Sequence, residues 1–311
     1  TAYEQLVRQY GDQAEQVQAA RARLVALGGA PSQTAGTEMT IRRVWSGAGV
    51  DASGSPSPDG RYLSITDPES GDLAVWDIAS GQKRRLTDKG MVLGSTWSPD
   101  GKKIAFASLN KDMVPELRVI GIDGSGLRTL AAAWPRDWSP DGRFLLALVS
   151  PDNTTAEMAL VSVADGSVTV LAMDGKPISS WNEGFSANSK YIVFDLPQRA
   201  GSPERDVFIT SIDGKQTIPL VKHPADDQLL GWVPGSDTVL FASNRAGTQD
   251  AWALRVVDGK AEGDPVLVRK DIGQISPMGF SDRGAFYYNV GVNVVDVFEA
   301  VGMHSAGRMT A

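Results

Sequence analysis

The chain has 311 residues, of which 42% are hydrophobic and 22% charged, as is typical of a globular protein, and its net charge is −7. An acidic surface repels phosphate backbones, which argues against nucleic acid as a partner. The complete lack of cysteine excludes disulfides, thiolate nucleophiles and cysteine-ligated zinc.

The first segment, residues 1–29, has apolar residues at helical spacing in both of its halves. Gly11 and Asp12 interrupt the pattern, and Gly28 and Gly29 end it. We therefore expect a short helical hairpin at 1–29, interpreted as the end of a helical-repeat region. A polar linker is expected at 30–38.

One phrase then recurs through the chain and dominates the interpretation. Its copies are SPSPDGRYLSI (55–65), TWSPDGKKIAF (96–106), DWSPDGRFLLA (137–147), GFSANSKYIVF (184–194), GWVPGSDTVLF (231–241) and GFSDRGAFYY (279–288). Aligned copies are separated by 41, 41, 47, 47 and 48 residues. This period is typical of a four-stranded propeller blade, and the Pro-Asp-Gly turn would join strands a and b.

The remainder of each period supplies strands c and d. An apolar stretch such as LAVWDIASG (73–81) ends in glycine and is followed by a short strand such as KRRLT (83–87). The sixth period lacks a strand d, and TIRRVW (40–45) reads like the missing strand. We therefore predict an all-β fold over residues 39–311. It is a six-bladed β-propeller of four-stranded antiparallel blades, closed by an N-terminal strand.

The phrases Trp97–Phe106 and Trp138–Ala147 resemble the TolB-like, WD-related propeller repeat, and FASNRAGTQDAW (241–252) is similar to that family's b–c segment. The resemblance covers about residues 39 to 302. The first copy departs from it by having Pro56 in place of tryptophan, and the last three copies lose Pro-Asp-Gly. The helical segment at 1–29 resembles the closing helices of tetratricopeptide-like repeats.

The resemblance implies a bacterial, periplasmic or otherwise extracytoplasmic protein that acts as a protein-binding scaffold, although a cytoplasmic location stays open. The family also includes propellers fused to serine hydrolase domains. Because one fold serves many functions, the residues themselves must be weighed.

The sequence gives little support for catalysis or for a metal. It has no Gly-x-Ser-x-Gly elbow, and its two histidines, His223 and His304, are expected at the surface. The repeated turn aspartates Asp59, Asp100 and Asp141 lie in separate blades and are explained by turn chemistry. We therefore expect no catalytic residue, no metal and no cofactor.

A binding site is expected where the d–a and b–c loops share one face of the propeller and surround the mouth of its channel. The residues that approach strand a there are mixed but mainly acidic: Asp51, Arg136, Asp137, Trp181, Asn182, Glu183, Asp226, Asp227 and Gln274. Two longer b–c loops could extend this face, with Met113 or Pro203 as exposed anchors.

The sequence thus predicts a non-catalytic, monomeric scaffold that binds a protein or peptide through the d–a/b–c loop face and the channel mouth. It predicts no nucleic-acid partner and no transmembrane segment, since no apolar run approaches roughly 20 residues. The alternative is the substrate-gating propeller of a prolyl-oligopeptidase-like serine hydrolase whose catalytic domain is absent from this chain. For the aspartates and loop residues, a purely structural role is the competing interpretation.

Overall fold

A computed structural model describes residues 40–47, 53–150, 156–171, 182–199, 201–290 and 295–301. The chain divides into two compact units, Thr1–Glu38 and Met39–Ala311, and every described residue belongs to the second. The helical hairpin predicted at 1–29 and the linker predicted at 30–38 lie outside the described residues. Within the described ranges, all regular structure is β-strand, and no helix there is long and apolar enough to cross a membrane.

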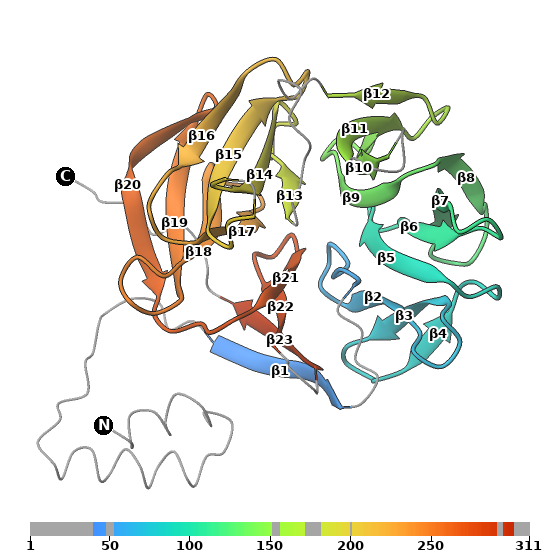
Figure 1. Ribbon diagram of the computed structural model, residues 1–311. Helices are drawn as coiled ribbons and strands as arrows, with labels where there is room; N and C mark the ends of the chain where they lie inside the picture. The colour runs from blue at the N-terminus through green and yellow to red at the C-terminus, as the bar shows by residue number, and fades with distance from the viewer. Residues whose placement is uncertain are drawn as a thin grey trace, which may run out of the picture. The chain divides into compact units, whose positions relative to one another are not determined.

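The strands form six sheets arranged in a ring (Figure 1), with strand a of each blade nearest its centre. Blade 1 holds β2 (Tyr62–Thr66), β3 (Leu73–Asp77) and β4 (Lys83–Arg85). Blade 2 holds β5 (Val92–Trp97), β6 (Lys103–Leu109), β7 (Pro115–Gly121) and β8 (Arg128–Ala131). Blade 3 holds β9 (Trp134–Trp138), β10 (Phe144–Val149), β11 (Glu157–Ser162) and β12 (Val168–Val170).

Blade 4 holds β13 (Glu183–Phe185), β14 (Tyr191–Pro197), β15 (Arg205–Ser211) and β16 (Thr217–Val221). Blade 5 holds β17 (Asp227–Trp232), β18 (Thr238–Ser243), β19 (Asp250–Val257) and β20 (Lys260–Arg269). Blade 6 holds β21 (Ser276–Phe280), β22 (Phe286–Val290), β23 (Val295–Val301) and β1 (Thr40–Gly47). The predicted six-bladed propeller of antiparallel sheets is confirmed.

The closing strand is also confirmed. β1 pairs antiparallel with β23, from Thr40 opposite Val301 to Gly47 opposite Val295, and so becomes strand d of the last blade. Within this sheet Arg42 forms an ion pair with Glu299 at 2.7 Å, and the buried Tyr287 donates its hydroxyl hydrogen to the same carboxylate. The pairing covers an edge that would otherwise be open.

Two details differ from the sequence prediction. Strand a of blade 1 is reduced, among the described residues, to an isolated bridge between Pro56 and Leu63, because the Ser55 N–H donates to the Ser64 hydroxyl at 3.1 Å instead of continuing the ladder. Strand d of blade 5 is longer than the short strand d that the repeat predicts, because it begins at Lys260 and runs to Arg269. Asp258 and Gly259 both have positive φ and form a tight hairpin turn that carries the ladder straight on.

The repeated phrase forms a self-contained turn. In blade 3 the Ser139 hydroxyl donates to Asp141 Oδ1 at 2.6 Å, and that oxygen accepts the Arg143 backbone N–H at 3.0 Å. Ser139 Oγ in turn accepts the Phe144 N–H at 2.9 Å. Blades 1, 2 and 4 repeat these contacts, with Asn188 replacing aspartate in blade 4. The contacts support the turn interpretation of the repeated aspartates.

Neighbouring blades pack through apolar faces and are joined by specific hydrogen bonds. Trp97 Nε1 donates to the Ser55 carbonyl at 3.1 Å, and Trp138 Nε1 donates to the Thr96 carbonyl at 3.2 Å. Each of these two tryptophans therefore packs against the preceding blade.

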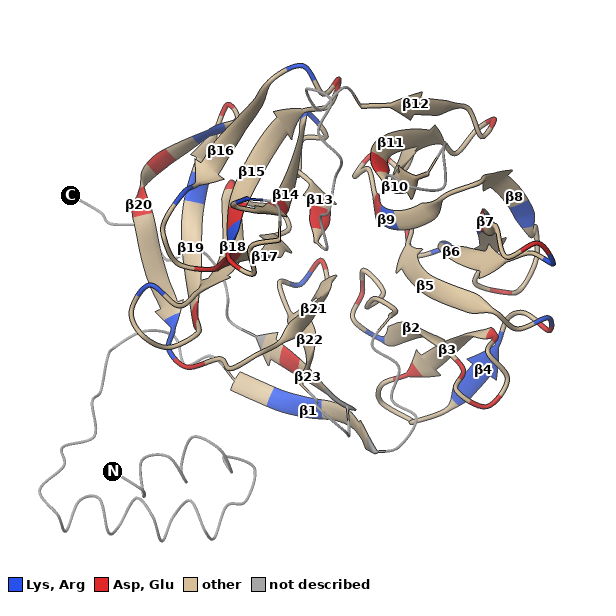
Figure 2. Ribbon diagram, in the orientation of Figure 1, with Lys and Arg blue, Asp and Glu red and all other residues tan. Residues whose placement is uncertain are grey.

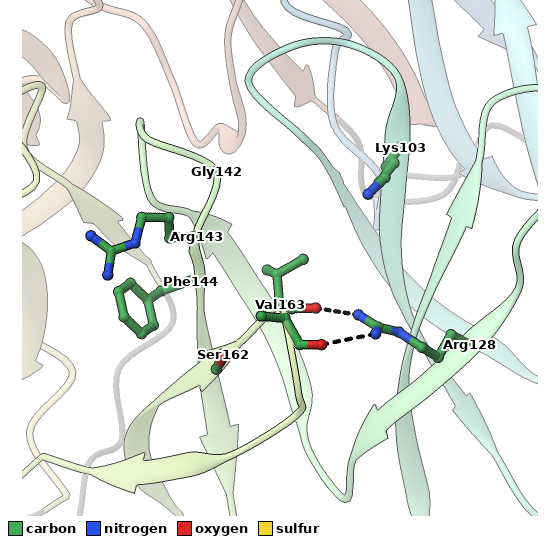
Figure 3. A pocket seen from close by; sticks show the side chains of 8 residues that line it. Lys103, Arg128, Gly142, Arg143, Phe144, Ser162 and Val163 are labelled. Carbon is green, nitrogen blue, oxygen red and sulfur yellow. Dashed lines mark hydrogen bonds between the residues drawn. The ribbon is translucent and has the colours of Figure 1, made fainter.

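At the outer rim, arginines of strand d reach the following blade. Arg84 donates to the Ile122 carbonyl at 2.6 Å, and Arg128 donates to the carbonyls of Val163 and Ala164 (Figure 3). We call the side with the b–c and d–a loops the loop face, and the side with the a–b and c–d turns the turn face.

Candidate functional site

The loop face is built on an acidic residue that begins strand c in every blade. These residues are Asp72, Glu116, Glu157, Asp206, Asp250 and Asp296, each followed by a buried apolar residue. Sequence reasoning missed this position, although aligning the six strand c segments would have revealed it. Its structural role is clearest in blades 1 and 5.

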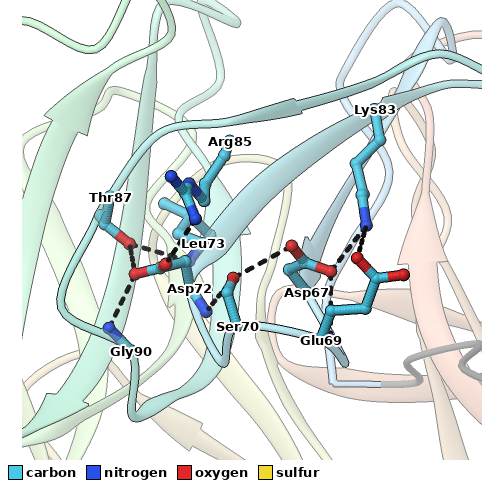
Figure 4. A network of polar contacts seen from close by, with 9 residues as sticks. All are labelled: Asp67, Glu69, Ser70, Asp72, Leu73, Lys83, Arg85, Thr87 and Gly90. Carbon is cyan, nitrogen blue, oxygen red and sulfur yellow. Dashed lines mark hydrogen bonds and ion pairs between the residues drawn. The ribbon is translucent and has the colours of Figure 1, made fainter.

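In blade 1, Asp72 fastens the b–c loop to the next d–a loop (Figure 4). Its Oδ1 accepts the Thr87 hydroxyl at 2.9 Å and the Gly90 backbone N–H at 2.7 Å. Nearby, Lys83 forms an ion pair with Asp67 at 2.7 Å. In blade 5, Asp250 Oδ1 accepts the Asp271 N–H at 2.8 Å in the same way. Asp72 and Asp250 therefore hold the loops in place, and both are buried and shielded from a ligand.

Strands β9 and β13, which lie beside the centre of the ring (Figure 2), bring three of the predicted site residues together. Arg136 Nε lies 3.6 Å from Glu183 Oε2, and the two side chains are 32% and 1% exposed. Asp137 Oδ1 accepts the N–H of Trp138, and its Oδ2 accepts the N–H of Phe185, both at 2.8 Å. Asp137 therefore bridges the two blades through their backbones.

Burial raises the pKa of Asp137 to about 7, although two backbone amides stabilise its carboxylate, and the neighbouring Glu183 carboxylate raises it further. A half-protonated carboxyl group at neutral pH is a feature of many functional sites, and also of buried structural acids. Here both carboxylate oxygens already accept backbone hydrogen bonds, which favours a structural role.

Blades 4 and 5 assemble a second polar group. Asp195 is fully buried and accepts Arg205 at 2.8 Å, Asn182 Nδ2 at 3.2 Å and the Leu229 N–H at 2.9 Å. Asp226 Oδ1 accepts the Arg205 N–H at 3.0 Å. Asp195 and Arg205 were not among the predicted site residues.

Asp227 is paired more deeply. Its Oδ1 accepts Arg245 at 2.7 Å, and the side chains of the pair are 0% and 14% exposed. The Arg245 guanidinium also lies over the rings of Phe241 and Trp252, at 5.0 and 5.2 Å. Such a desolvated, doubly stacked pair is fixed in place, and burial raises the pKa of Asp227.

The predicted set therefore divides by accessibility. Gln274 is exposed, and Arg136, Asn182 and Asp226 are partly exposed, whereas the Glu183 and Asp227 side chains are buried. Asp51 and Trp181 lie outside the described residues. Whether any of these residues binds a partner stays a prediction.

An apolar group lies in the d–a loop that leads into blade 2, at the start of its strand a, and in its b–c loop. Its members are Met91 and Leu93, each 46% exposed, Met113, 62% exposed, and Val114, 38% exposed. The Met91 carbonyl accepts the Leu109 N–H at 3.0 Å, which joins the d–a loop to strand b where the b–c loop begins. We call these four residues the methionine patch.

No family model matches the chain, and no curated protein does. Solved structures do resemble it. A protein assigned as TolB from Agrobacterium tumefaciens has 16% identity and a TM-score of 0.59, covering 84% of this chain and 97% of its own.

TolB from Acinetobacter baumannii has 14% identity and a TM-score of 0.54, covering 91% of this chain and 69% of its own. A prolyl endopeptidase has 19% identity and a TM-score of 0.50, covering 79% of this chain and 41% of its own. Identities this low establish the fold alone. The chain has the fold of a TolB-like six-bladed β-propeller.

Proposed function

We propose that the protein is a non-catalytic scaffold that binds a protein or peptide through its loop face. The observation that carries this proposal is the methionine patch. Large apolar side chains that gather at one exposed place mark interaction sites, and flexible methionine adapts to varied partner surfaces. The TolB-like fold supports the proposal.

The backbone of the patch adds a second argument. Met91 and Met113 both have φ of +60°, in the left-handed region that bulky side chains seldom occupy. Asn110 holds the second loop in shape, since its Oδ1 accepts the N–H groups of Asp112 and Val114. Backbone strain retained at exposed loops is a feature of binding sites.

Asparagine substitution separates binding from stability, because asparagine tolerates positive φ and removes the apolar side chain. We expect the M91N/M113N variant to keep its thermal unfolding midpoint and to lose at least about tenfold in partner capture, the loss expected when two apolar anchors are removed. The measurement is quantitative cross-linking of the full chain in extracts, with captured proteins compared between variants.

The matched control is V168T/V170T. Both valines lie on the outer strand β12 and are about as exposed as Met91, at 44% and 45%. This variant should capture the same proteins as the wild type. Equal capture by M91N/M113N and the wild type would remove the methionine patch from the proposed site.

The alternative, a substrate-gating propeller of a prolyl-oligopeptidase-like hydrolase, is supported by the likeness to the prolyl endopeptidase fold alone. An extracytoplasmic location belongs to the same proposal and is supported by the TolB-like fold. Cell fractionation with an antibody against the propeller tests the location.

A further inference from the structure

A basic hollow lies on the turn face between blades 2 and 3 (Figure 3). It has a volume of about 490 Å³, and its charged lining residues are Lys103, Arg128 and Arg143. None of the eight residues that line it is a carboxylate. This concentration of positive charge stands out in a chain whose net charge is −7.

The strand register of blade 2 explains two of these cations. Ala105 lies opposite Val119, which lies opposite Arg128, so all three side chains share one face of the sheet. Lys103, two residues before Ala105 on β6, belongs to the same face. This face packs against blade 3, where Ala105 and Val119 join its apolar core.

Blade 3 supplies the other wall of the hollow. Leu145 and Val161 pack against blade 2. Arg143 precedes Leu145 by two residues, and its carbonyl accepts the Val163 N–H at 2.9 Å, but its guanidinium turns away from Lys103 and Arg128 (Figure 3). The cations that face the hollow where the apolar interface ends are therefore Lys103 and Arg128 of blade 2, and like charges side by side favour an anion between them.

The cations differ in how they are held. Arg128 is anchored by the carbonyls of Val163 and Ala164. Lys103 makes no ion pair within 4.0 Å among the described residues, although its charge acts on the Asp100 carboxylate and, together with the larger effect of the hydrogen bond from Ser98, lowers the pKa of that group. Arg143 is 73% exposed, 4.0 Å from Asp141, with its guanidinium over the Phe144 ring. A fixed guanidinium beside an adjustable ammonium group suits an anion.

An adjoining hollow of about 540 Å³ extends the positive surface. It shares Lys103 and Arg128 with the first hollow and adds Lys102. Its one acid, Asp123, has Oδ1 engaged by the hydroxyl and N–H of Ser125. The basic surface thus continues across the strand d edge of blade 2.

We propose that this hollow binds a multivalent anion carrying phosphate or carboxylate groups, with Lys103 and Arg128 at its centre and Lys102 at its edge. The site lies on the turn face and is distinct from the loop face proposed to bind a protein.

The test is a calorimetric titration of the full chain with inorganic pyrophosphate, and separately with citrate, at constant ionic strength. The two arms distinguish phosphate from carboxylate as the preferred group. We expect saturable one-site binding of one of them, weakened about tenfold by K103Q and further by adding K102Q, the loss expected for removed charge-assisted contacts. Arg128 is not substituted, because it also joins the blades.

Lys190 provides the control. It occupies the same turn position in blade 4 as Lys102 in blade 2, is exposed, and does not line either hollow. K190Q should bind like the wild type, and K103Q and K102Q should keep the wild-type unfolding midpoint. Absence of saturable binding by both anions, or equal weakening by K190Q and K103Q, would overturn the proposal.

Discussion

Asp137 occupies a position at which every other blade has a small residue. The residues before the inward-packing position are Ser55, Thr96, Asp137, Gly184, Gly231 and Gly279. Blade 4 has Phe185 where blades 2 and 3 have a tryptophan, and phenylalanine has no ring N–H to donate to the preceding blade. The Asp137 carboxyl group of blade 3 accepts the backbone N–H of Phe185 instead. Blade 4 is thereby joined to blade 3 through a titratable group.

The pH dependence of stability follows from the raised pKa. The folded protein holds a proton on Asp137 up to a pH near 7, whereas the unfolded chain releases it near 3.8, so the unfolding free energy falls as pH rises between these values. We expect D137N to flatten this slope by up to about 1.4 kcal/mol per pH unit. The asparagine side chain has only one oxygen and accepts only one of the two backbone N–H groups that Asp137 accepts. D137N should therefore also be less stable than the wild type near pH 4.5.

Urea unfolding at pH values from 4.5 to 8 measures this change. The control is D141N: hydrogen bonds to Ser139 and Arg143 outweigh partial burial and lower the pKa of Asp141, so its titration lies below this range. An unchanged slope in D137N would show that other groups set the pH dependence.

Residue roles were predictable from the sequence where local contacts decide them. In each Ser-Pro-Asp-Gly turn the aspartate carboxylate accepts hydrogen bonds from residues of the same turn, so the repetition in the sequence alone was enough to identify the turns. Asp137 and Asp227 were predicted as channel-mouth residues, but their environment depends on strands of neighbouring blades. Burial created by distant parts of the chain does not appear in a local pattern.

At the scale of elements, β1 is the strand whose loss should cost most. It covers the outer edge of β23, and Trp45 stacks on Trp76 of blade 1 with ring centroids 4.7 Å apart. Deleting residues 1–47 removes this ladder and leaves an open edge, which promotes pairing between molecules.

We expect the protein lacking residues 1–47 to lose several kcal/mol of unfolding free energy, at about 1 kcal/mol for each lost hydrogen bond, and to self-associate. Deletion of residues 1–38 keeps β1 and serves as the control, with an unchanged midpoint and a monomeric elution volume. Thermal unfolding and size-exclusion chromatography measure both. A stable monomer without β1 would contradict the closure role.

The strands themselves were largely predictable because apolar alternation and turn glycines mark them locally. The exceptions, at Pro56 and at Lys260, arise from backbone chemistry. Next to Pro56 the Ser64 hydroxyl accepts the Ser55 N–H, and before Lys260 two positive φ angles make a hairpin tighter than the repeat suggests.

At the scale of the whole molecule, each described blade packs mainly against its two neighbours, and the ring is closed. Closure ties the stability of every blade to the others, so we expect residues 39–311 to unfold in one cooperative step. Urea transitions followed by tryptophan fluorescence and by far-ultraviolet circular dichroism should therefore coincide. Separate midpoints would show that blades unfold independently.

The pairing of β1 with β23 also constrains synthesis of the protein. Arg42 and Glu299, partners in this sheet, are 257 residues apart, so β1 leaves the ribosome on the order of ten seconds or more before its partner exists. During that wait β1 is a strand without a sheet. Arg42 and Arg43 place two adjacent positive charges within it, and such gatekeeper charges oppose premature aggregation of nascent chains.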